Sequence, residues 1–505
     1  MSQASQRNRP ADEEVVPTLF ATTMREGRVA IARSHRLHRL RGGFCARGYC
    51  QQCPVRTGAG EALACELPPG PIPSVAVDPL RPLGMAAERM TPWFYERRFR
   101  RPRALRQAYL RSLRAMSVAA VLPEEPAERG PADAEDLATD VLVVGGGPSG
   151  IAAAARIADA GAFVTIVTRG TLGGSAPVDA SHSSAIERDL ETLGLRGARL
   201  MPGSLCLGLY EQEDLAAVLG PSGPFTVRFE RLVVATGAYD RLPLVPGNDL
   251  PGVVGLRAFE RLAAHDAFAR GTRVGVVGAP GELIRARAAS ERFSVPVSWS
   301  TAPEEGGDAL VRIEGRRRVR SARLASGGRH QCDVLVVGMT QPMFELLVHA
   351  GRRARVEGAP PIVRARGPAR MPLLVVGEAA GHVDPDEAIA GARRDGAAWV
   401  DGGSPVGADE PAIASFAPSG PPDPDAFVCL CEDVRVRDIV RCVADGFDDL
   451  ELIKRRTGAT TGPCQGKLCL GLLCEAAASV GVEASIPTMR PPLRPVRIAS
   501  LGGDG

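Results

Sequence analysis

The middle of this chain, from about Thr139 to Val400, alternates short runs of Val, Leu and Ile with Ala-rich stretches. Asp140 to Val144 form an apolar run of strand length, and after a glycine-rich turn residues 151–162 have the composition of a buried helix. Strands that alternate with helical segments are typical of parallel βαβ units. The pattern therefore predicts an α/β fold for this part of the chain.

Two stretches rich in Pro, Gly and acidic residues, 123–136 and 402–425, flank this α/β region. Neither composition favours a regular helix or strand. A length of 505 residues also suggests about three or four domains. We expect an N-terminal Cys-rich domain, a helical connector with its linker, the α/β domain, a small helical domain and an extended tail. Their predicted ranges are residues 18–90, 91–135, 136–400, 425–480 and 481–505.

Composition and charge exclude some functions. The 61 basic and 58 acidic residues leave a net charge of +3, which does not indicate a nucleic-acid partner. No apolar run reaches the roughly 18 residues of a membrane span. The opening MSQASQRNRPADEEVVP lacks the apolar segment of an export signal, so we expect a cytoplasmic protein. Its twelve cysteines should then be thiols, and clustered thiols indicate metal ligands.

The first cysteine set contains Cys45, Cys50, Cys53 and Cys65. Its spacing, C-x4-C-x2-C with a remote fourth cysteine, is that of a plant-type [2Fe–2S] site. Zinc is the competing interpretation, but structural zinc sites favour C-x2-C pairs, which the four-residue gap does not match. The spacing therefore predicts an iron–sulfur cluster.

The second cysteine set contains Cys429, Cys431, Cys464 and Cys469. Two short helices are expected between its second and third members. Four thiolates at this spacing suit either a [2Fe–2S] cluster or zinc, and spacing alone leaves both open.

A nucleotide site is predicted directly after the first apolar strand. Gly145, Gly147 and Gly150 fit G-x-G-x-x-G between a strand and a helix, a context in which backbone N–H groups bind a pyrophosphate. Ser149 lies within the same turn and is part of the predicted site. The next strand ends at Thr168 rather than at the acid that normally binds a ribose hydroxyl, so this sequence departs from the full pattern.

A second dinucleotide-binding fold is suggested by RVGVVGAPGELIRARAA, which contains Gly278 and Gly281. Pro280 occupies the region where another glycine is expected, and no suitable acid follows. We interpret this segment as a structural βαβ unit whose NAD(P) site is weakened or lost.

Other segments resemble known modules. LVVATGAYDRLPLVPGNDLPGV, with Gly237, resembles the ATG turn of flavin disulfide-reductase-like enzymes. MPLLVVGEAAGHVDPDEAIAGARRDGAAW, with Gly377 and Glu378, resembles the late element that holds the FAD ribityl chain and pyrophosphate, where the acid is usually Asp. FVCLCEDV and LIKRRTGATTGPCQGKLC resemble the bacterioferritin-associated ferredoxin-like domain, a small helical [2Fe–2S] module.

In this order the modules resemble the alpha subunits of heteromeric amino-acid dehydrogenases and oxidases, such as hydrogen cyanide synthase, opine and D-hydroxyproline dehydrogenases and sarcosine oxidase. The resemblance implies a flavoprotein with two dinucleotide-binding domains, flanked by an N-terminal plant-type ferredoxin-like domain and a C-terminal helical one. It implies FAD and two [2Fe–2S] clusters as cofactors. It also implies an electron acceptor and a partner, a beta-type FAD-dependent subunit that oxidises the substrate. We expect no catalytic residue in this chain, since no acid–base or nucleophilic constellation is present.

Two alternative functions remain open at this point, namely a self-contained NAD(P)H-dependent reductase and a cluster-bearing scaffold with a decayed flavin site. A further alternative concerns the Arg-rich helical segment predicted at residues 92–116, whose apolar face carries Leu105, Tyr109, Leu113 and Met116. We interpret this helix as a connector, and peripheral membrane contact is the alternative.

Overall fold

The computed structural model describes most of the chain outside the predicted linkers. The described residues are 17–34, 36–57, 60–71, 107, 135–174, 180–210, 213–303, 306–357, 362–400, 421–483 and 486–501. The predicted connector, with its Arg-rich helix, and most of the second linker lie outside them.

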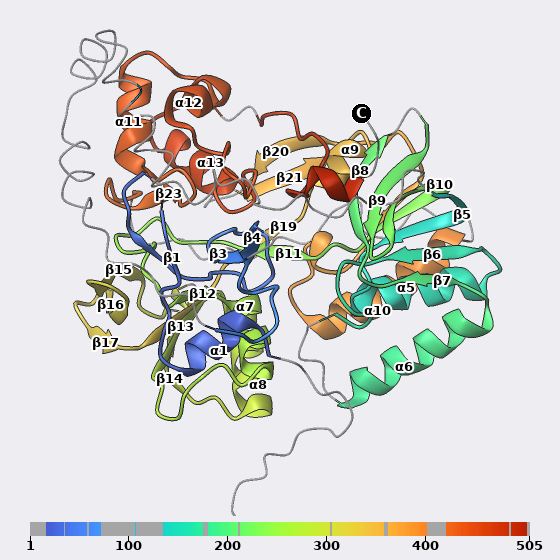
Figure 1. Cartoon of the computed structure of the whole chain (residues 1–505), viewed down its shortest axis with the longest axis horizontal. Helices are drawn as coiled ribbons and strands as arrows, with labels where there is room; N and C mark the ends of the chain where they lie inside the picture. The colour runs from blue at the N-terminus through green and yellow to red at the C-terminus, as the bar shows by residue number, and fades with distance from the viewer. Residues whose placement is uncertain are drawn as a thin grey trace, which may run out of the picture.

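The largest sheet has seven strands in the order β7-β6-β5-β10-β9-β8, with β22 paired to β10 (Figure 1). Its centre is β5 (Glu135–Val144), which pairs in parallel with both β6 and β10. This strand begins five residues before the predicted Asp140, inside the predicted linker, because its first half pairs with residues 225–229 of β10. The other strands are β6 (Val164–Val167), β7 (Arg199–Met201), β8 (Leu205–Tyr210), β9 (Leu215–Gly220), β10 (Gly223–Val234) and β22 (Leu373–Val375).

Helices α5 (Pro148–Asp159), α6 (Ala180–Leu195) and α10 (Pro385–Val400) pack beside this sheet. Helix α5 begins three residues before the predicted Ile151, because proline is well accommodated in the first turn of a helix. Its alanines are buried against the sheet, which confirms the predicted βαβ unit.

A smaller parallel sheet has the order β12-β18-β13-β14. Its strands are β12 (Val253–Gly255), β13 (Val274–Gly278), β14 (Val297–Thr301) and β18 (Val334–Gly338). Helices α7 (Leu256–Ala264) and α8 (Pro280–Phe293) follow β12 and β13, respectively. The second dinucleotide-binding-like segment is therefore a βαβ unit.

Short antiparallel sheets complete this part of the chain. Their strands are β11 (Ala238–Asp240) with β19 (Thr340–Pro342), β15 (Leu310–Gly315) with β16 (Val319–Leu324) and β17 (Arg329–Gln331), and β20 (Arg353–Glu357) with β21 (Ile362–Arg366). The remaining helical elements here are α9 (Glu345–His349) and the 3₁₀ turn η3 (Gly377–Ala379).

The N-terminal Cys-rich segment has one short helix and two small hairpins. These are α1 (Leu19–Arg25), β1 (Ala32–Arg33) with β2 (Leu40–Arg41), and β3 (Pro54–Thr57) with β4 (Gly60–Leu63). The C-terminal segment contains β23 (Phe427–Cys429), β24 (Val434–Arg435), α11 (Val436–Ala444), α12 (Leu450–Thr457), α13 (Leu470–Ala478) and η4 (Ile498–Leu501).

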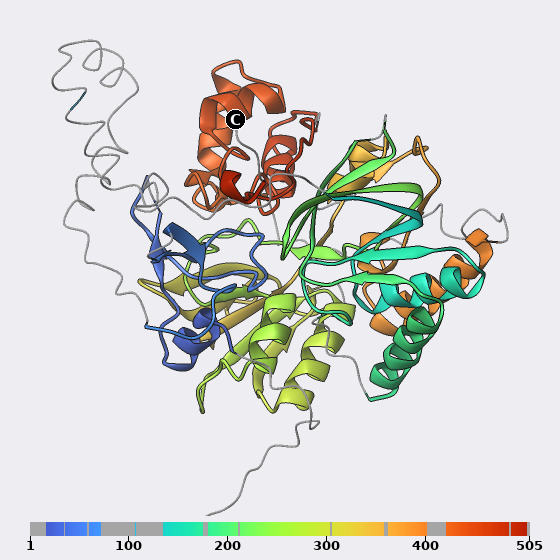
Figure 2. The ribbon, with the colours of Figure 1, turned by 45° about the vertical axis from the view of Figure 1, so that its right-hand side comes forward.

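The N-terminal segment lies between the C-terminal helices and the smaller sheet in both ribbon views (Figures 1 and 2). The N–H of Gly255 donates to the carbonyl of Phe44, and the N–H of Leu37 donates to the carboxylate of Asp433. Segments from opposite ends of the chain are thus packed together. Among the described residues, no helix is both long and apolar enough to cross a membrane.

Candidate functional site

The first glycine turn joins β5 to α5 and combines close packing with an open position. A Cβ at Gly145, where φ is +116°, would lie 2.1 Å from the carbonyl oxygen of Ala235, and one at Gly150 would lie 2.0 Å from that of Gly145. A Cβ at Gly147 would meet no atom within 4 Å. The outer glycines therefore allow the turn to pack, while the middle one leaves space at a helix N-terminus, as pyrophosphate binding requires.

The predicted FAD-binding pair Gly377 and Glu378 lies next to this turn. A Cβ on Gly377, which has a positive φ, would lie 2.8 Å from the hydroxyl oxygen of Ser149. A Cβ on Gly237 would lie 3.4 Å from Oε2 of Glu378. These residues follow the carboxyl ends of the adjacent parallel strands β5, β10 and β22. The structure brings together all the residues predicted to bind the dinucleotide, namely Gly145, Gly147, Ser149, Gly150, Gly237, Gly377 and Glu378.

Glu378 is held by two arginines that the sequence did not single out. Its Oε1 accepts from Nη2 of Arg257 at 2.7 Å and is also paired with Arg285. Burial alone would raise the pKa of this carboxyl, but Arg257 and Arg285 outweigh burial and hold the pKa well below its usual range. Glu378 is therefore a fixed anion at the edge of the glycine turn.

The same two arginines extend the network into the core. Arg257 is 2% exposed and also forms ion pairs with Asp240 at 3.3 Å and Glu282 at 3.4 Å. Arg285 pairs with Glu260 at 2.8 Å. Isolated buried charges are costly, so each member of this network needs the others.

Glu282 occupies the second glycine turn. It lies in the first turn of α8, is 1% exposed, and accepts hydrogen bonds from Arg257 and Thr340. A Cβ on Gly338 would lie 2.8 Å from the Cβ of Glu282, and one on Gly278 would lie 2.8 Å from Gly338. The second turn therefore places a buried carboxylate of the chain itself at the start of α8.

Thr168 and Arg169 stand where a ribose-binding acid is usual. A Cβ on Gly146 would lie 2.8 Å from the methyl carbon of Thr168, so this side chain packs on the glycine turn. Arg169 donates to the carboxylate of Glu66 and to the carbonyl of Arg47, both at 2.8 Å. The position after β6 thus contacts the loops of the first cysteine set.

The four thiols of the first cysteine set are at most 1% exposed and lie in two pairs. The thiols of Cys45 and Cys50 share a hydrogen bond, and so do those of Cys53 and Cys65. Sγ of Cys45 also accepts from the backbone N–H groups of Arg47 at 3.4 Å and of Cys50 at 3.3 Å. Burial would raise the pKa of Cys45, but these hydrogen bonds outweigh it and lower the pKa to about 7.

The loop that presents these thiols has a compact backbone with left-handed residues. Ala46 has φ 46°, Gly48 has φ 73° and Gln51 has φ 57°. These conformations turn the chain repeatedly between the first three cysteines, as wrapping a loop around one centre requires.

The four thiols of the second cysteine set are at most 2% exposed and form a closed ring of contacts. Cys429 and Cys464 each share hydrogen bonds with both Cys431 and Cys469. A Cβ on Gly462 would lie 2.4 Å from the Cβ of Cys431, so only glycine fits against this ligand position. Hydrogen bonds from Cys429 and Cys464 lower the pKa of Cys431 well below its usual value.

Among the described residues, no group of three or more His, Cys, Asp or Glu side chains is found that could hold a metal ion. A [2Fe–2S] cluster makes a different demand, because two irons share four thiolates in a site wider than a mononuclear one. Buried thiols at the predicted positions, with backbone N–H donors to sulfur in the first set, fit that demand. The donor chemistry of both sets therefore suits a binuclear cluster.

The first cysteine set is tied to the glycine turn by hydrogen bonds. The hydroxyl of Tyr49 donates to Oδ2 of Asp240 at 3.1 Å and accepts from its backbone N–H at 2.7 Å. Asp240 in turn pairs with Arg257, which binds Glu378. An unbroken polar chain thus links a residue between two predicted cluster ligands to the predicted flavin site.

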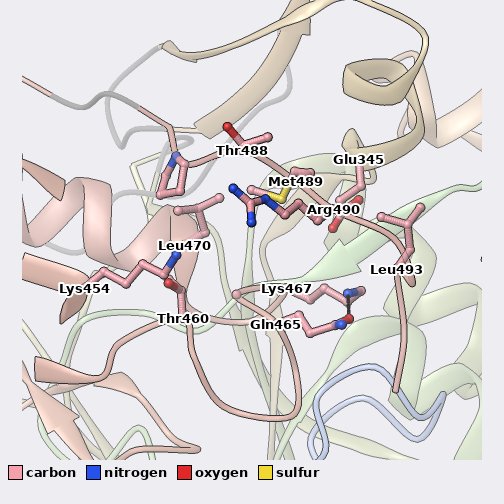
Figure 3. A pocket seen from close by; sticks show the side chains of 12 residues that line it. Glu345, Lys454, Thr460, Gln465, Lys467, Leu470, Thr488, Met489, Arg490 and Leu493 are labelled. Atoms are coloured by element: carbon pink, nitrogen blue, oxygen red, sulfur yellow. Dashed lines mark hydrogen bonds between the residues drawn. The ribbon is translucent and has the colours of Figure 1, made fainter. Parts of the chain in front are cut away.

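A hollow with about 580 Å³ of open space lies beside the second cysteine set (Figure 3). Lys454 and Lys467, the only lysines of the chain, both line it, together with Arg490. Nζ of Lys467 donates to Oε1 of Gln465 at 2.9 Å, and burial lowers the pKa of this lysine. These cations place positive charge beside the loop that carries Cys464 and Cys469.

Sequence reasoning missed several residues of this site. Arg257 and Arg285 had no distinguishing signal, because arginine is abundant along the whole chain. Tyr49 and Gln52 could have been noticed as spacers between predicted ligands, but their contacts are with residues distant in sequence.

Comparison with known proteins defines the class first. Residues 139–280 match the family model described as pyridine nucleotide-disulphide oxidoreductase, and residues 423–504 match the sarcosine oxidase A3 domain. L-proline dehydrogenase from P. horikoshii has a similar fold, with a TM-score of 0.69 and 19% identity over 96% of this chain and 94% of that one. The chain is thus an oxidoreductase with a mixed α/β, dinucleotide-binding flavoprotein fold.

The sequence relatives are more specific. Sarcosine oxidase subunit alpha of Rhizobium meliloti (strain 1021) is 27% identical over 96% of this chain and 56% of its own length. The subunit of that name from Corynebacterium sp. (strain P-1) is 26% identical over 72% of this chain and 45% of its own length. HcnB, a hydrogen cyanide synthase subunit of Pseudomonas protegens, is 29% identical over 16% of this chain and 18% of its own length.

These findings confirm the predicted resemblance. The chain is a relative of the alpha subunits of sarcosine oxidase and of hydrogen cyanide synthase subunit HcnB. It spans about half the length of the sarcosine oxidase subunits that it matches.

Proposed function

We propose that this chain is the electron-transfer subunit of a heteromeric amine or amino-acid dehydrogenase or oxidase. It carries FAD at the first glycine turn and a [2Fe–2S] cluster at each cysteine set. The observation that carries this proposal is the chain of polar contacts from Glu378 to Tyr49, which joins the predicted flavin site to the first cysteine set. In this proposal the N-terminal segment is a plant-type ferredoxin-like domain and the C-terminal segment is a small helical [2Fe–2S] domain.

The residues of the first turn fit a flavin dinucleotide. The open position at Gly147 and the N-terminal N–H groups of α5 accept the pyrophosphate. Ser149 and Gly377 border it, and Glu378 is held in place by its arginines to accept hydrogen bonds from the ribityl hydroxyls. Bound FAD supplies the exchange between two-electron and one-electron transfer.

The residues of the cysteine sets fit the clusters. The eight thiols act as ligands, and burial keeps water away from them. Backbone N–H groups that donate to sulfur, such as those of Arg47 and Cys50, stabilise the charge on the thiolates and tune the reduction potential.

The proposed division of labour assigns substrate oxidation to another chain. The relatives are named as subunits, which supports a hetero-oligomer with a beta-type FAD-dependent partner. Near the glycine turn, Arg257 and Arg285 form ion pairs with Glu282 and Glu378. All twelve cysteines are free thiols, which supports a cytoplasmic location.

The chain purified anaerobically tests the cofactors. We expect one FAD per chain, and iron and sulfide in amounts that correspond to two binuclear clusters. Zinc at a cysteine set in place of iron, or a chain that cannot bind flavin, would contradict the corresponding assignment.

Co-expression with its partner flavoprotein tests the division of labour. We expect the complex to oxidise an amine or amino acid from a substrate panel and reduce an artificial acceptor, while this chain alone does not. Efficient substrate oxidation by the isolated chain would overturn the proposal.

A further inference from the structure

The ligand loops of the two cysteine sets touch each other through Gln52. This residue lies between Cys50 and Cys53 and is 1% exposed. Its Nε2 donates to the carbonyl oxygen of Cys50 at 3.0 Å and to Sγ of Cys431, a member of the second set, at 3.5 Å. A side chain inside the first ligand loop thus contacts a thiol of the second set, 379 positions away in the sequence.

The orientation of this amide follows from its neighbours. The carbonyl of Cys50 and the sulfur of Cys431 are both acceptors, so only the NH₂ group of Gln52 can face them favourably. Its Oε1 is buried without a hydrogen-bond partner.

Surrounding contacts fix the distance between the two loops. Arg41, which is 6% exposed, donates to the carbonyl of Cys431 at 2.8 Å from the strand that precedes the first set. Arg39 pairs with Asp433 at 2.5 Å, two residues beyond the same thiol. Three side chains of the N-terminal segment therefore converge on the loop around one cysteine of the C-terminal segment.

We propose that Gln52 is a positioning residue that couples the two cysteine sets into one two-cluster unit. The inference rests on the proposed function, because it requires both clusters. In the transfer, one electron would pass from a cluster held by the first set to a cluster held by the second, with no bond made or broken and no proton moved. The order of contacts then runs from Glu378 through Asp240 and Tyr49 to the first set, and through Gln52 to the second.

The physical role of Gln52 is electrostatic. An N–H donor to a thiolate stabilises the more negative, reduced state of the cluster that the thiolate holds, and so favours an electron there. A hydrogen bond to a charged group is worth about 1.5 kcal/mol or somewhat more, and 1.4 kcal/mol is a factor of ten in an equilibrium. Loss of the donor should therefore shift the electron toward the first cluster by roughly tenfold.

The test uses the full chain with both clusters, reduced stepwise under anaerobic conditions. Electron paramagnetic resonance reports which cluster holds the first electron. Gln52→Leu removes the donor at similar size, and Gln52→Glu replaces it with an acceptor that carries negative charge. We expect the share of electrons on the second cluster to fall about tenfold in the first variant and further in the second.

Gln51→Leu is the matched control, because Gln51 occupies the same loop and its amide donates to the carbonyl of Gly48 rather than to the second set. This variant should keep the wild-type electron distribution. A shift of equal size in the control would show that loop packing, and not the amide, sets the distribution, and would overturn the proposal.

Iron and sulfide content separates the two levels of the hypothesis. If the wild-type chain holds fewer than two clusters, the proposed function fails and the coupling fails with it. If both variants hold two clusters and share electrons as the wild type does, only the coupling is wrong.

Discussion

The two βαβ units of this chain place similar glycine turns in opposite environments. At the first turn, Gly147 faces open space at the start of α5. At the second, Glu282 from the first turn of α8 lies buried between Arg257 and Thr340. Both helix N-termini favour negative charge, because their first N–H groups lack partners within the helix.

The two turns differ in the source of the negative charge that their helix N-termini favour. The first turn leaves the anion to be supplied by a ligand, whereas the second receives a carboxylate from its own helix. That carboxylate is part of the network that also holds Glu378 beside the first turn. The second unit therefore supports the first site, and this relation can be tested by separating stability from flavin binding.

The largest effect is expected from Arg257→Met, which removes the cation shared by Asp240, Glu282 and Glu378. Breaking a buried pair by removing one partner costs about 3–5 kcal/mol of unfolding free energy. Denaturant unfolding followed by circular dichroism measures this cost. Arg273→Met is the matched control, because Arg273 pairs with Asp333 at the surface and should cost less than about 1 kcal/mol. Equal costs for both variants would show that the network does not stabilise the fold.

A smaller effect is expected from Glu378→Gln, which should lower the free energy of unfolding by about 1–3 kcal/mol at neutral pH. Because the folded-state pKa of Glu378 is lowered, its ion pairs stabilise the fold above the unfolded value of 4.5, and this contribution decreases as the pH falls below that value. Denaturant unfolding at several pH values should show the gap between wild type and variant narrowing progressively as the pH falls below 4.5 toward the lower folded-state pKa. A gap that does not change with pH would contradict the role of the two arginines.

Gly147→Ala should leave stability almost unchanged and weaken flavin binding. The added methyl group meets no atom of the chain, but it occupies the space proposed for the pyrophosphate. We expect affinity for FAD to fall about tenfold or more, a loss of about 1.4 kcal/mol, measured from flavin absorbance or fluorescence. Gly281→Ala is the control at the second turn, where the new Cβ would make ordinary contact with Val383 at 3.6 Å. Similar losses in both variants would mean that the first turn is not the flavin site.

The smallest effect, no measurable change at all, is expected when the flavin is mixed with the reduced nicotinamides NADH and NADPH. Because Glu282 in the first turn of α8 already pairs with Arg257 and supplies a carboxylate there, NADH and NADPH should cause no saturable bleaching of the flavin in a stopped-flow trace. Reduction by a chemical reductant is the positive control. Saturable bleaching by either nucleotide would favour the alternative of a self-contained reductase.

Local patterns in the sequence were sufficient to predict the strand and the helix on either side of the first glycine turn. The apolar run before Gly145 and the alanines after it predicted β5 and α5, and the structure extends both toward the N-terminus by a few residues. The extension of β5 depends on pairing with β10, ninety positions away along the chain, which no local pattern reports. Cysteine spacing likewise predicted two sets of four, of which the structure brings the first together as two hydrogen-bonded pairs and the second as one ring of contacts.

The sequence by itself therefore determined the α/β class, the glycine turn and the membership of each cysteine set, because these depend on residues that are close along the chain or on fixed spacings. Only the tertiary structure decided how the sites are connected. The ion pairs of Arg257 and the contact of Gln52 with Cys431 join segments that are far apart in sequence. Their energies depend on burial, since the same side chains in water would interact weakly.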